Sequence, residues 1–266
     1  MHPTALRTLA FASFSCLLFV GCANPDPTEE TTSQISNTRG QAFTTGPSVT
    51  YSGCTNHDWF GFGSKSVISS MVPSQYILAT DPASAVTPVG IVVTHCDSLK
   101  IDGREQGPAT WADIVALIVS PDGTGTNSAY RLWQYTDSPA YASVMARNGI
   151  PIDFRPQLDY AYSECGAPAC PMSASPHHSV HSPFVLTGTV VQVSIPVGDD
   201  DGNFWYETPT GPVKSNYHST SPVFHPATYT LTGLEGELAD VFGSASPTVS
   251  FFQGSFSYEG QLNITR

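Results

Sequence analysis

Cysteines are the residues of this sequence whose type and spacing most directly suggest covalent chemistry, and the chain contains 6 of them. Four lie in the body of the chain, and in an exported protein an even number of cysteines favours disulfides. Of the three pairings that four cysteines allow, we expect Cys165 with Cys170, across the short Gly-Ala-Pro-Ala loop, and Cys54 with Cys96. The shorter loop should stabilise the fold less, because its closure removes less chain entropy.

Metal ligands are the alternative use of these and other polar side chains. Cys165 and Cys170 precede a group of histidines, and thiolate and imidazole are ligands that zinc prefers. The spacing is not that of a standard zinc finger, and export favours oxidised cysteines. The segment Asp199–Asn203 with Glu207 offers the oxygen ligands of calcium, but not with the spacing of an EF-hand. We therefore predict no metal and no cofactor. The histidines that follow the two cysteines are His177, His178 and His181. His218 and His225 are a second pair of possible metal ligands.

The N-terminal residues have the pattern of an export signal. Arg7 is the only charged residue before Asp26, and residues 9–20 (LAFASFSCLLFV) are almost wholly apolar. This apolar segment is shorter than the about 20 residues that a membrane-spanning helix needs. It suits the hydrophobic region of a secretory signal, so we expect residues 1–21 to be a signal peptide.

Cys22 follows this signal directly, in the sequence Leu-Phe-Val-Gly-Cys, which resembles a bacterial lipobox. The resemblance implies cleavage before Cys22 and a diacylglycerol group on its sulfur. No Asp follows Cys22, which for a Gram-negative source implies the outer membrane rather than the inner one. The alternative is an ordinary signal peptide with a coincidental cysteine.

Composition and charge limit the partners of the mature chain. The net charge is −12, and loss of Arg7 with the signal changes it to 9 − 22 = −13. Nucleic-acid binding needs clustered Lys and Arg, so we expect no nucleic-acid partner. A lipid anchor rather than a basic patch would hold the protein to the membrane. Residues 22–47 are rich in Pro, Thr, Ser and Glu and read as a flexible tether.

We expect the remaining residues, 48–266, to form a single domain in which strands predominate. Apolar, β-branched runs at 88–96 and 114–120 predict strands, and residues 130–135 (YRLWQY) read as a returning strand. Residues 184–195 predict a long strand that Asp199–Asn203 turns back into Phe204–Glu207. Ser138 and Gly149 bound one short helix, and Gly243 ends a second one over 234–242.

These elements predict a mostly β (α+β) fold. We expect an antiparallel, barrel-like or strongly curved sheet around a cavity, with two short helices. Strand alternation puts Arg131, Trp133 and Tyr135 on one face. His95, Arg131 and Trp133 are the candidate residues for binding a small molecule in the cavity.

The order of these elements resembles that of the acetoacetate decarboxylase-like superfamily. The strand and turn Tyr130–Asp137, the helix that ends at Arg147–Pro151, and the tryptophan-containing strand, hairpin and short helix over Phe204–Gly243 are similar to that family's pattern. The resemblance covers roughly Ser48–Ile264. It implies strands around an internal cavity that accepts a small organic molecule.

The sequence departs from this family at the residue that carries its chemistry. The family's decarboxylase forms a Schiff base through a lysine whose pKa an adjacent lysine lowers. The lysines here are Lys65, Lys100 and Lys214, and none is next to another. No catalytic residue is therefore expected to transfer from the resemblance.

Three functions remain open at this point. The first is a lipid-anchored protein that binds a small organic or lipid-like ligand in a barrel cavity. The second is a lyase or hydrolase that uses His or Asp on the same scaffold. The third is an interaction protein of the envelope with neither pocket nor chemistry, which a large exposed apolar patch would favour.

Overall fold

The computed structural model describes residues 45–176 and 183–266. The expected signal peptide, Cys22 and almost all of the expected tether lie outside the described residues, as do His177, His178 and His181. In chain order the elements are β1 (Thr45–Ser64), α1 (Lys65–Met71), β2 (Val86–Ile101), β3 (Arg104–Ile118), β4 (Asn127–Thr136), α2 (Pro139–Arg147), β5 (Asp153–Phe154), β6 (Leu158–Tyr162), β7 (Ala169–Pro176), β8 (Val185–Val191), β9 (Ile195–Pro196), β10 (Asp200–Thr208), β11 (Gly211–Thr232), α3 (Gly236–Phe242) and β12 (Ser250–Thr265).

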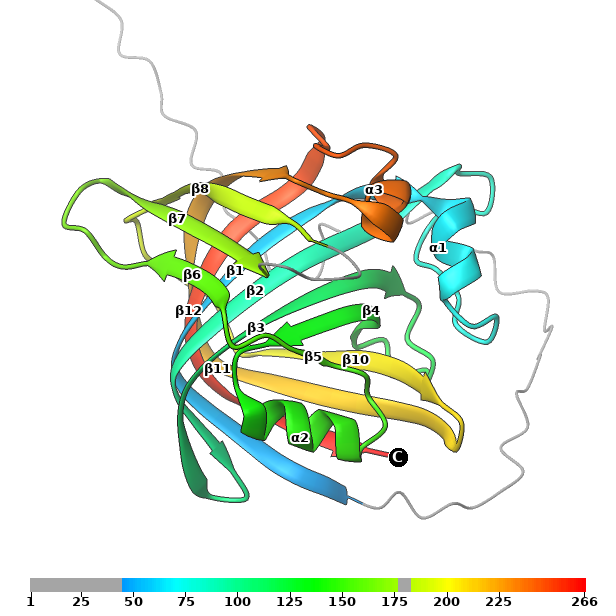
Figure 1. Ribbon diagram of the computed structural model, residues 1–266, viewed down its shortest axis with the longest axis horizontal. Coiled ribbons are helices and arrows are strands. Elements are labelled where there is room, and N and C mark those ends of the chain that lie inside the picture. The colour runs from blue at the N-terminus through cyan, green and yellow to red at the C-terminus, as the bar shows by residue number, and fades with distance from the viewer. Residues whose placement is uncertain (1–44, 177–182) are drawn as a thin grey trace, which may run out of the picture. The chain divides into compact units, whose positions relative to one another are not determined.

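Seven strands close into a barrel. Their order is β10-β4-β3-β2-β1-β12-β11, and an additional pairing of β11 with β10 completes the ring (Figure 1). Most neighbours in the ring are antiparallel, whereas β10 joins β4 in parallel. The predicted mostly β, barrel-like fold is therefore confirmed.

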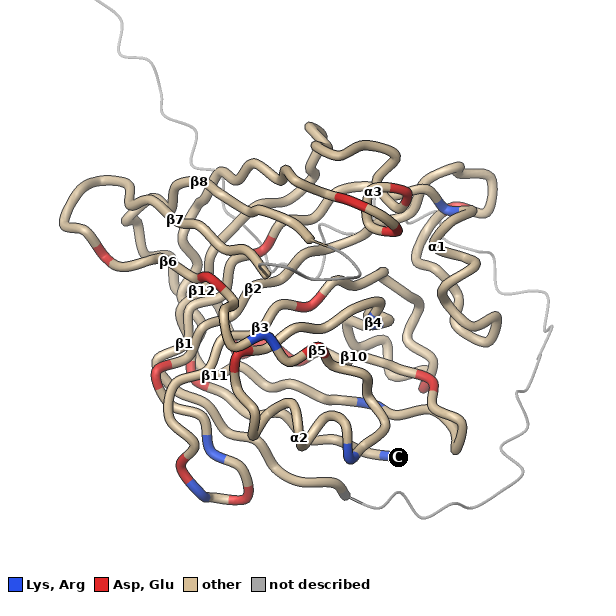
Figure 2. Tube along the Cα trace, in the orientation of Figure 1, with Lys and Arg blue, Asp and Glu red and all other residues tan. Residues whose placement is uncertain are grey.

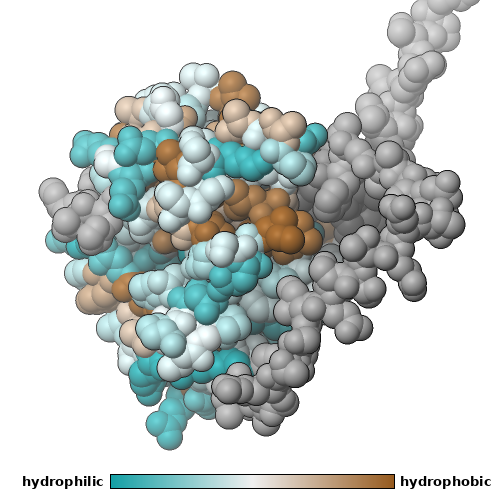
Figure 3. Space-filling view, turned by 90° about the vertical axis from the view of Figure 1, so that its right-hand side faces the viewer, coloured by the Kyte–Doolittle hydropathy of each residue, from teal (hydrophilic) through white to brown (hydrophobic). Residues whose placement is uncertain are grey.

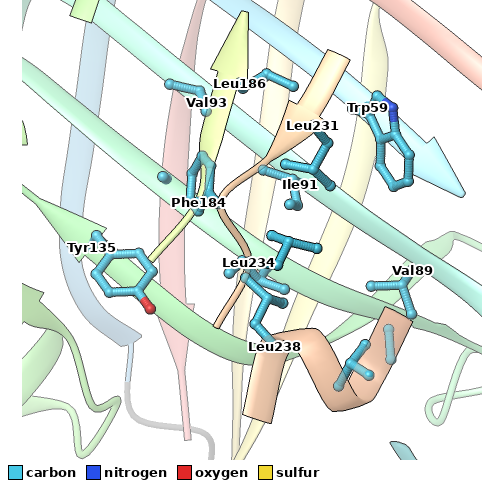
Figure 4. Close-up of a cluster of buried hydrophobic side chains, with 14 of the residues drawn as sticks. Trp59, Val89, Ile91, Val93, Tyr135, Phe184, Leu186, Leu231, Leu234 and Leu238 are labelled. Atoms are coloured by element: carbon cyan, nitrogen blue, oxygen red, sulfur yellow. The ribbon is translucent and has the colours of Figure 1, made fainter. Parts of the chain in front are cut away.

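A second, smaller sheet continues from the C-terminal half of β11. Residues Ala227–Thr232 of β11 pair with β8, which leads to β7 and β6. This sheet packs with α1 and α3 over the face of β1, β2 and β3 that points out of the barrel. Side chains from both sheets and from α3 meet in this core, among them Trp59, Ile91, Leu186 and Leu231 (Figure 4).

Helix α2 and a separate apolar cluster fill one end of the barrel. Tyr141, Val144 and Met145 of α2 are buried against residues of the ring strands such as Tyr51 and Leu262. The helix begins where the sequence predicts, because the Ser138 hydroxyl accepts a hydrogen bond from the Tyr141 amide at 3.3 Å.

The structure corrects two details of the predicted elements. It contains a third, short helix, α1, whose N-cap residue Ser64 makes no capping hydrogen bond, because its hydroxyl pairs with that of Ser66 at 3.1 Å. The predicted hairpin between 184–195 and 204–207 is wrong, since β8 pairs with β7 and β11 instead. Asp200–Asn203 begin β10, and that strand turns back at Thr208–Gly211 to pair with β11.

The described surface combines acidic, polar and scattered apolar positions. Acidic residues outnumber basic ones, 22 to 10 in the full chain, and are spread along the trace (Figure 2). Apolar side chains gather on the end that carries α1 and α3 (Figure 3). In the part of the chain described, no helix has both the length and the apolar character needed to cross a membrane.

Candidate functional site

A buried ion pair inside the barrel is the centre of the candidate site. Nε of Arg131 on β4 donates to Oδ1 of Asp113 on β3 at 2.6 Å, and both side chains are 2% exposed. The Arg131 guanidinium also lies over the Phe204 ring of β10, 4.7 Å from its centroid. Burial raises the pKa of Asp113, and Arg131 opposes that rise. Such a pair is costly to bury, so its presence suggests a role other than packing.

Arg131 points into the barrel because β4 contains a bulge. Trp133 is paired with Ile114, yet Arg131 is paired with Val115, so Leu132 is an extra residue between them. A bulge of this kind reverses the alternation of side chains on one side of it. The prediction that Arg131 shares a face with Trp133 and Tyr135 is therefore wrong. Gln134 is the residue that shares the inner face with Arg131.

Two polar atoms at this centre have no hydrogen-bond partner among the described residues. They are Nη1 of Arg131 and Oε1 of Gln134, and both side chains are buried. Nε2 of Gln134 donates to the Tyr141 hydroxyl at 3.4 Å, which leaves its carbonyl oxygen as the unused end. Because an unsatisfied buried polar atom costs about 1–3 kcal/mol, such atoms call for an explanation. The interior thus offers one unused donor and one unused acceptor on the same strand.

Asp58 lies on the same inner rung of the barrel as Asp113 and Gln134. The register pairs Asp58 with Val92, Val92 with Asp113, and Asp113 with Gln134. Asp58 and Asp113 are thus two strands apart, which corresponds to about 10 Å at about 4.8 Å per strand. Burial raises the pKa of Asp58 to about 7, although a hydrogen bond from Asn56 Nδ2 at 2.8 Å opposes the rise.

A third acid and two tyrosines complete the polar interior. The Tyr217 hydroxyl donates to Oδ2 of Asp200 at 3.2 Å, and burial raises the pKa of Asp200. Burial raises the pKa of Tyr258 above its ordinary value, and the charges of Asp58, Asp113 and Asp200 all add to that rise. All three carboxylates therefore act on one hydroxyl of the interior, and Arg131 pairs with one of them, Asp113.

His95 lies on the opposite, outer face, in a separate polar cluster. Its ring stacks on Tyr160 of β6 with centroids 4.8 Å apart, and its Nδ1 is 2.9 Å from the Thr110 hydroxyl. Beside it, the fully buried His57 bonds the Tyr229 hydroxyl through Nδ1 and the Tyr160 hydroxyl through Nε2, at 2.8 and 2.9 Å. A neutral imidazole, one nitrogen a donor and the other an acceptor, satisfies both hydroxyls.

The structure does not bring the three predicted ligand residues together. Arg131 lies in the barrel, His95 lies in the outer cluster, and Trp133 packs, partly buried, against the outer-face core. Sequence reasoning missed Asp58, Asp113 and Gln134. The one available signal was polarity within apolar runs, as in the Asp of Ala112-Asp-Ile114, but a single polar residue does not show which face of a strand is enclosed.

The Cys54–Cys96 pair is buried on the inner face of the barrel, with Cys54 opposite Tyr258, whereas the lysines lie at the surface. Cys54 and Cys96, directly opposite each other on β1 and β2, have sulfur atoms at disulfide distance, as do Cys165 and Cys170. Within residues 45–176 and 183–266, no three His, Cys, Asp or Glu side chains form a metal-binding group. Each lysine contacts surface groups: Lys65 the Asp81 and Pro82 carbonyls, Lys100 the Glu105 carboxylate and Lys214 the Asp122 carboxylate.

Two hollows lie on the surface, apart from the Arg131 centre. One, of about 500 Å³, crosses the outer face of β2, β1, β12 and β11 and is lined by hydroxyl and charged groups such as Ser52, Lys100 and Glu259. The other, of about 700 Å³, lies between α1 and α3. Neither is lined by Arg131, Asp113 or Gln134.

Comparison with known proteins identifies the fold. No family model and no curated protein matches the sequence. Among solved structures, an acetoacetate decarboxylase matches with a TM-score of 0.54 and 13% identity, over 88% of this chain and 93% of that one. The acetoacetate decarboxylase of Legionella pneumophila matches with 0.51 and 10%, over 87% and 90%. The enduracididine biosynthesis enzyme MppR, with HEPES buffer bound, matches with 0.52 and 14%, over 93% and 97%. The chain thus has the acetoacetate decarboxylase-like fold.

Proposed function

We propose that this protein is a lipid-anchored protein of the bacterial envelope that binds a small organic molecule inside its barrel. The observation that carries the proposal is the pair of unpartnered atoms, Arg131 Nη1 and Gln134 Oε1, beside the buried ion pair. A ligand that bonds both atoms recovers the free energy lost by their burial. The similarity of fold to MppR, whose structure holds a HEPES molecule, is consistent with an organic ligand.

The electrostatics of the interior favour a neutral polar group on that ligand. Asp113 already balances the charge of Arg131, and Asp58 and Asp200 lie in the same interior. An anionic group would therefore meet more negative than positive charge. A neutral group with one acceptor for Nη1 and one donor for Oε1, such as a carboxamide, complements both atoms.

The same proposal includes the absence of Schiff-base decarboxylation. A Schiff-base lysine must be uncharged near neutral pH, which requires burial or a neighbouring cation. Lys100 is half-exposed, with 50% of its side chain accessible, and it faces Glu105 rather than the barrel interior. Lys65 donates to two backbone carbonyls at the surface, and Lys214 pairs with a surface carboxylate.

The experiment is a binding measurement with carboxamide probes. Arg131→Lys keeps a cation for Asp113 but removes the free guanidinium nitrogen, whereas Trp133→Phe alters the outer face of the same strand. Hexanamide should bind the unaltered protein and the Trp133→Phe variant by calorimetry, and should lose most of its affinity for Arg131→Lys. Equal binding to all three proteins, or no binding of any carboxamide, would refute the proposal.

Catalysis by Asp58 is the second candidate. A pKa raised to about 7 makes a carboxyl group a competent general acid or base at neutral pH. A lyase or hydrolase acting through this group should lose turnover in Asp58→Asn while it retains ligand binding. A panel of esters, amides and β-keto acids with no turnover by the unaltered protein would leave binding as the function.

A further inference from the structure

We infer that the ligand carries an apolar tail, and that this tail lies along a track of phenylalanines leading from the barrel interior to the surface. The inference rests on the proposed function, since it extends the ligand whose polar group bonds Arg131. The phenylalanine track consists of rings on the inner face of three adjacent strands: Phe60 and Phe62 of β1, Phe251, Phe252 and Phe256 of β12, and Phe224 of β11.

The rings of the track form a continuous series of contacts. At the inner end, the Phe224 and Phe256 centroids are 5.2 Å apart, and Phe252 lies 6.2 Å from Phe224. Phe252 then contacts Phe60 at 6.2 Å. At the outer end, Phe251 lies 6.2 Å from Phe60 and 5.0 Å from Phe62. Each spacing is within the range of ring pairs in direct contact.

The inner end of the track meets the polar centre. Phe256 is paired with Asn56, and Gly254 with Asp58, so the track begins beside the Asp58 carboxyl. From there Tyr217 leads back to the ion pair, because its ring contacts Phe204 at 5.4 Å and Phe204 lies under the Arg131 guanidinium. The proposed ligand follows this series of rings, with its polar group at Arg131 and its tail on the phenylalanines.

Glycines keep the rings of the track flat against the sheet. A Cβ atom on Gly90 would lie 2.2 Å from Phe60, and one on Gly254 would lie 2.4 Å from Phe224 and 2.8 Å from Phe252. Gly202 makes the same room for Tyr217 at 2.2 Å. With a larger residue at these positions, the rings would have to tilt away from the sheet. With the glycines, the rings can lie against the backbone of the neighbouring strands.

Exposure increases from the inner to the outer end of the track. The Phe60, Phe224, Phe252 and Phe256 residues are partly buried, whereas Phe62 is 43% and Phe251 38% exposed. A bulge between Phe60 and Gly61 in the pairing of β1 with β12 turns Phe251 onto the same face as Phe252. From Asp58 to Phe62 the strand rises about 13 Å, at about 3.3 Å per residue. An extended alkyl chain fits this form, with its free end at the surface.

The test is a series of primary carboxamides of increasing chain length, from acetamide through hexanamide to decanamide, titrated into the mature protein by calorimetry. Each methylene that reaches the track should lower Kd by up to about fourfold, the equivalent of about 0.8 kcal/mol. Decanoate, which has the same tail and an anionic head, should bind more weakly than decanamide.

Two glycine variants connect the chain-length effect to the track. Gly90→Ala displaces the Phe60 ring and should weaken the binding of decanamide about tenfold, roughly the loss of two methylene contacts. The binding of shorter amides should be unaffected. Gly198→Ala is the matched control, because a Cβ there meets nothing within 4 Å and the backbone φ is ordinary. Circular dichroism of both variants verifies that each is folded.

The outcomes separate this inference from the proposed function. Hexanamide binding that depends on Arg131, together with a Kd that does not change with chain length, would overturn the inferred tail site. The proposed function would remain intact. Binding of no amide would refute both. Length-dependent binding that survives Arg131→Lys would show that the tail binds without the polar group bonding Arg131, which would overturn both.

Discussion

At the scale of single residues, the Asp113–Arg131 pair makes the most direct prediction about stability. Each charge is buried and tolerated only because the other is present. Asp113→Leu leaves the Arg131 cation without its partner and should cost about 3–5 kcal/mol, whereas the double variant with Arg131→Met removes both charges and should restore most of it. Urea unfolding measures both. A double variant as unstable as the single one would contradict this account.

Two neighbouring residues, His57 and Asp58, should give the protein opposing responses to pH. Burial lowers the pKa of His57 to about 3, with His225 and His95 adding to the effect, from 6.5. The stability it contributes is present above pH 6.5 and is lost as pH falls toward 3. Burial raises the pKa of Asp58 from 3.8 to about 7, so its contribution is present below pH 3.8 and is lost as pH rises toward 7.

Between pH 4 and 6.5 the two groups change the free energy of unfolding with pH in opposite directions, each by up to about 1.4 kcal/mol per pH unit. Relative to the unaltered protein, His57→Gln should therefore become progressively less stable as pH rises across this window. Asp58→Asn should become less stable as pH falls. The free energy of unfolding in urea at pH 4.5, 5.5 and 6.5 gives both slopes. Parallel pH profiles for all three proteins would show that neither group changes its pKa on folding.

At the scale of elements, the two cysteine pairs differ in the length of chain that each would constrain. The sequence separation is 42 residues for Cys54–Cys96 and 5 for Cys165–Cys170. Chain entropy predicts about 4 kcal/mol for the longer loop and about 2 kcal/mol for the shorter one. Two variants, each with both cysteines of one pair replaced by alanine, test this order of stabilisation. Their free energies of unfolding are measured under oxidising conditions. Equal losses would show that unfolded-state structure or strain dominates.

The helices and the bulge show where sequence was informative and where it was not. Ser138 and Gly243 act locally, through a capping hydrogen bond and a left-handed φ of 64°, so α2 and α3 are predictable. The extra residue Leu132 in β4 is set by pairing with β3, which no local signal records. That single bulge decides that Arg131 faces the interior, and so the candidate site could not be assembled from alternation alone.

At the scale of the whole molecule, the ring of strands explains why polar residues distant in sequence act together. Asp58, Asp113 and Asp200 belong to three different strands, and the closure of β10 against both β4 and β11 encloses them. Only the closure of the ring makes one face of each strand an interior. The resemblance in element order predicted such an enclosure, but not which side chains line it.

The lipid anchor is the prediction that concerns the protein as a whole. The mature chain would carry a net charge of 9 − 22 = −13, so attraction to anionic lipid would not hold it to a membrane. Acyl chains on Cys22 would contribute about 0.8 kcal/mol per buried methylene, which is independent of salt. In the native host, the protein should fractionate with the envelope, resist a high-salt wash and dissolve in detergent. It should also incorporate a labelled palmitate analogue.

Cys22→Ser should lose both the label and the attachment while it folds and binds carboxamides as the unaltered protein does. Cys16→Ser is the matched control, because Cys16 lies within the expected signal and leaves with it. An unlabelled protein released in soluble form, with an N-terminus other than residue 22, would instead identify an ordinary signal peptide. Release by salt from a labelled protein would mean that the acyl chains are not what holds it.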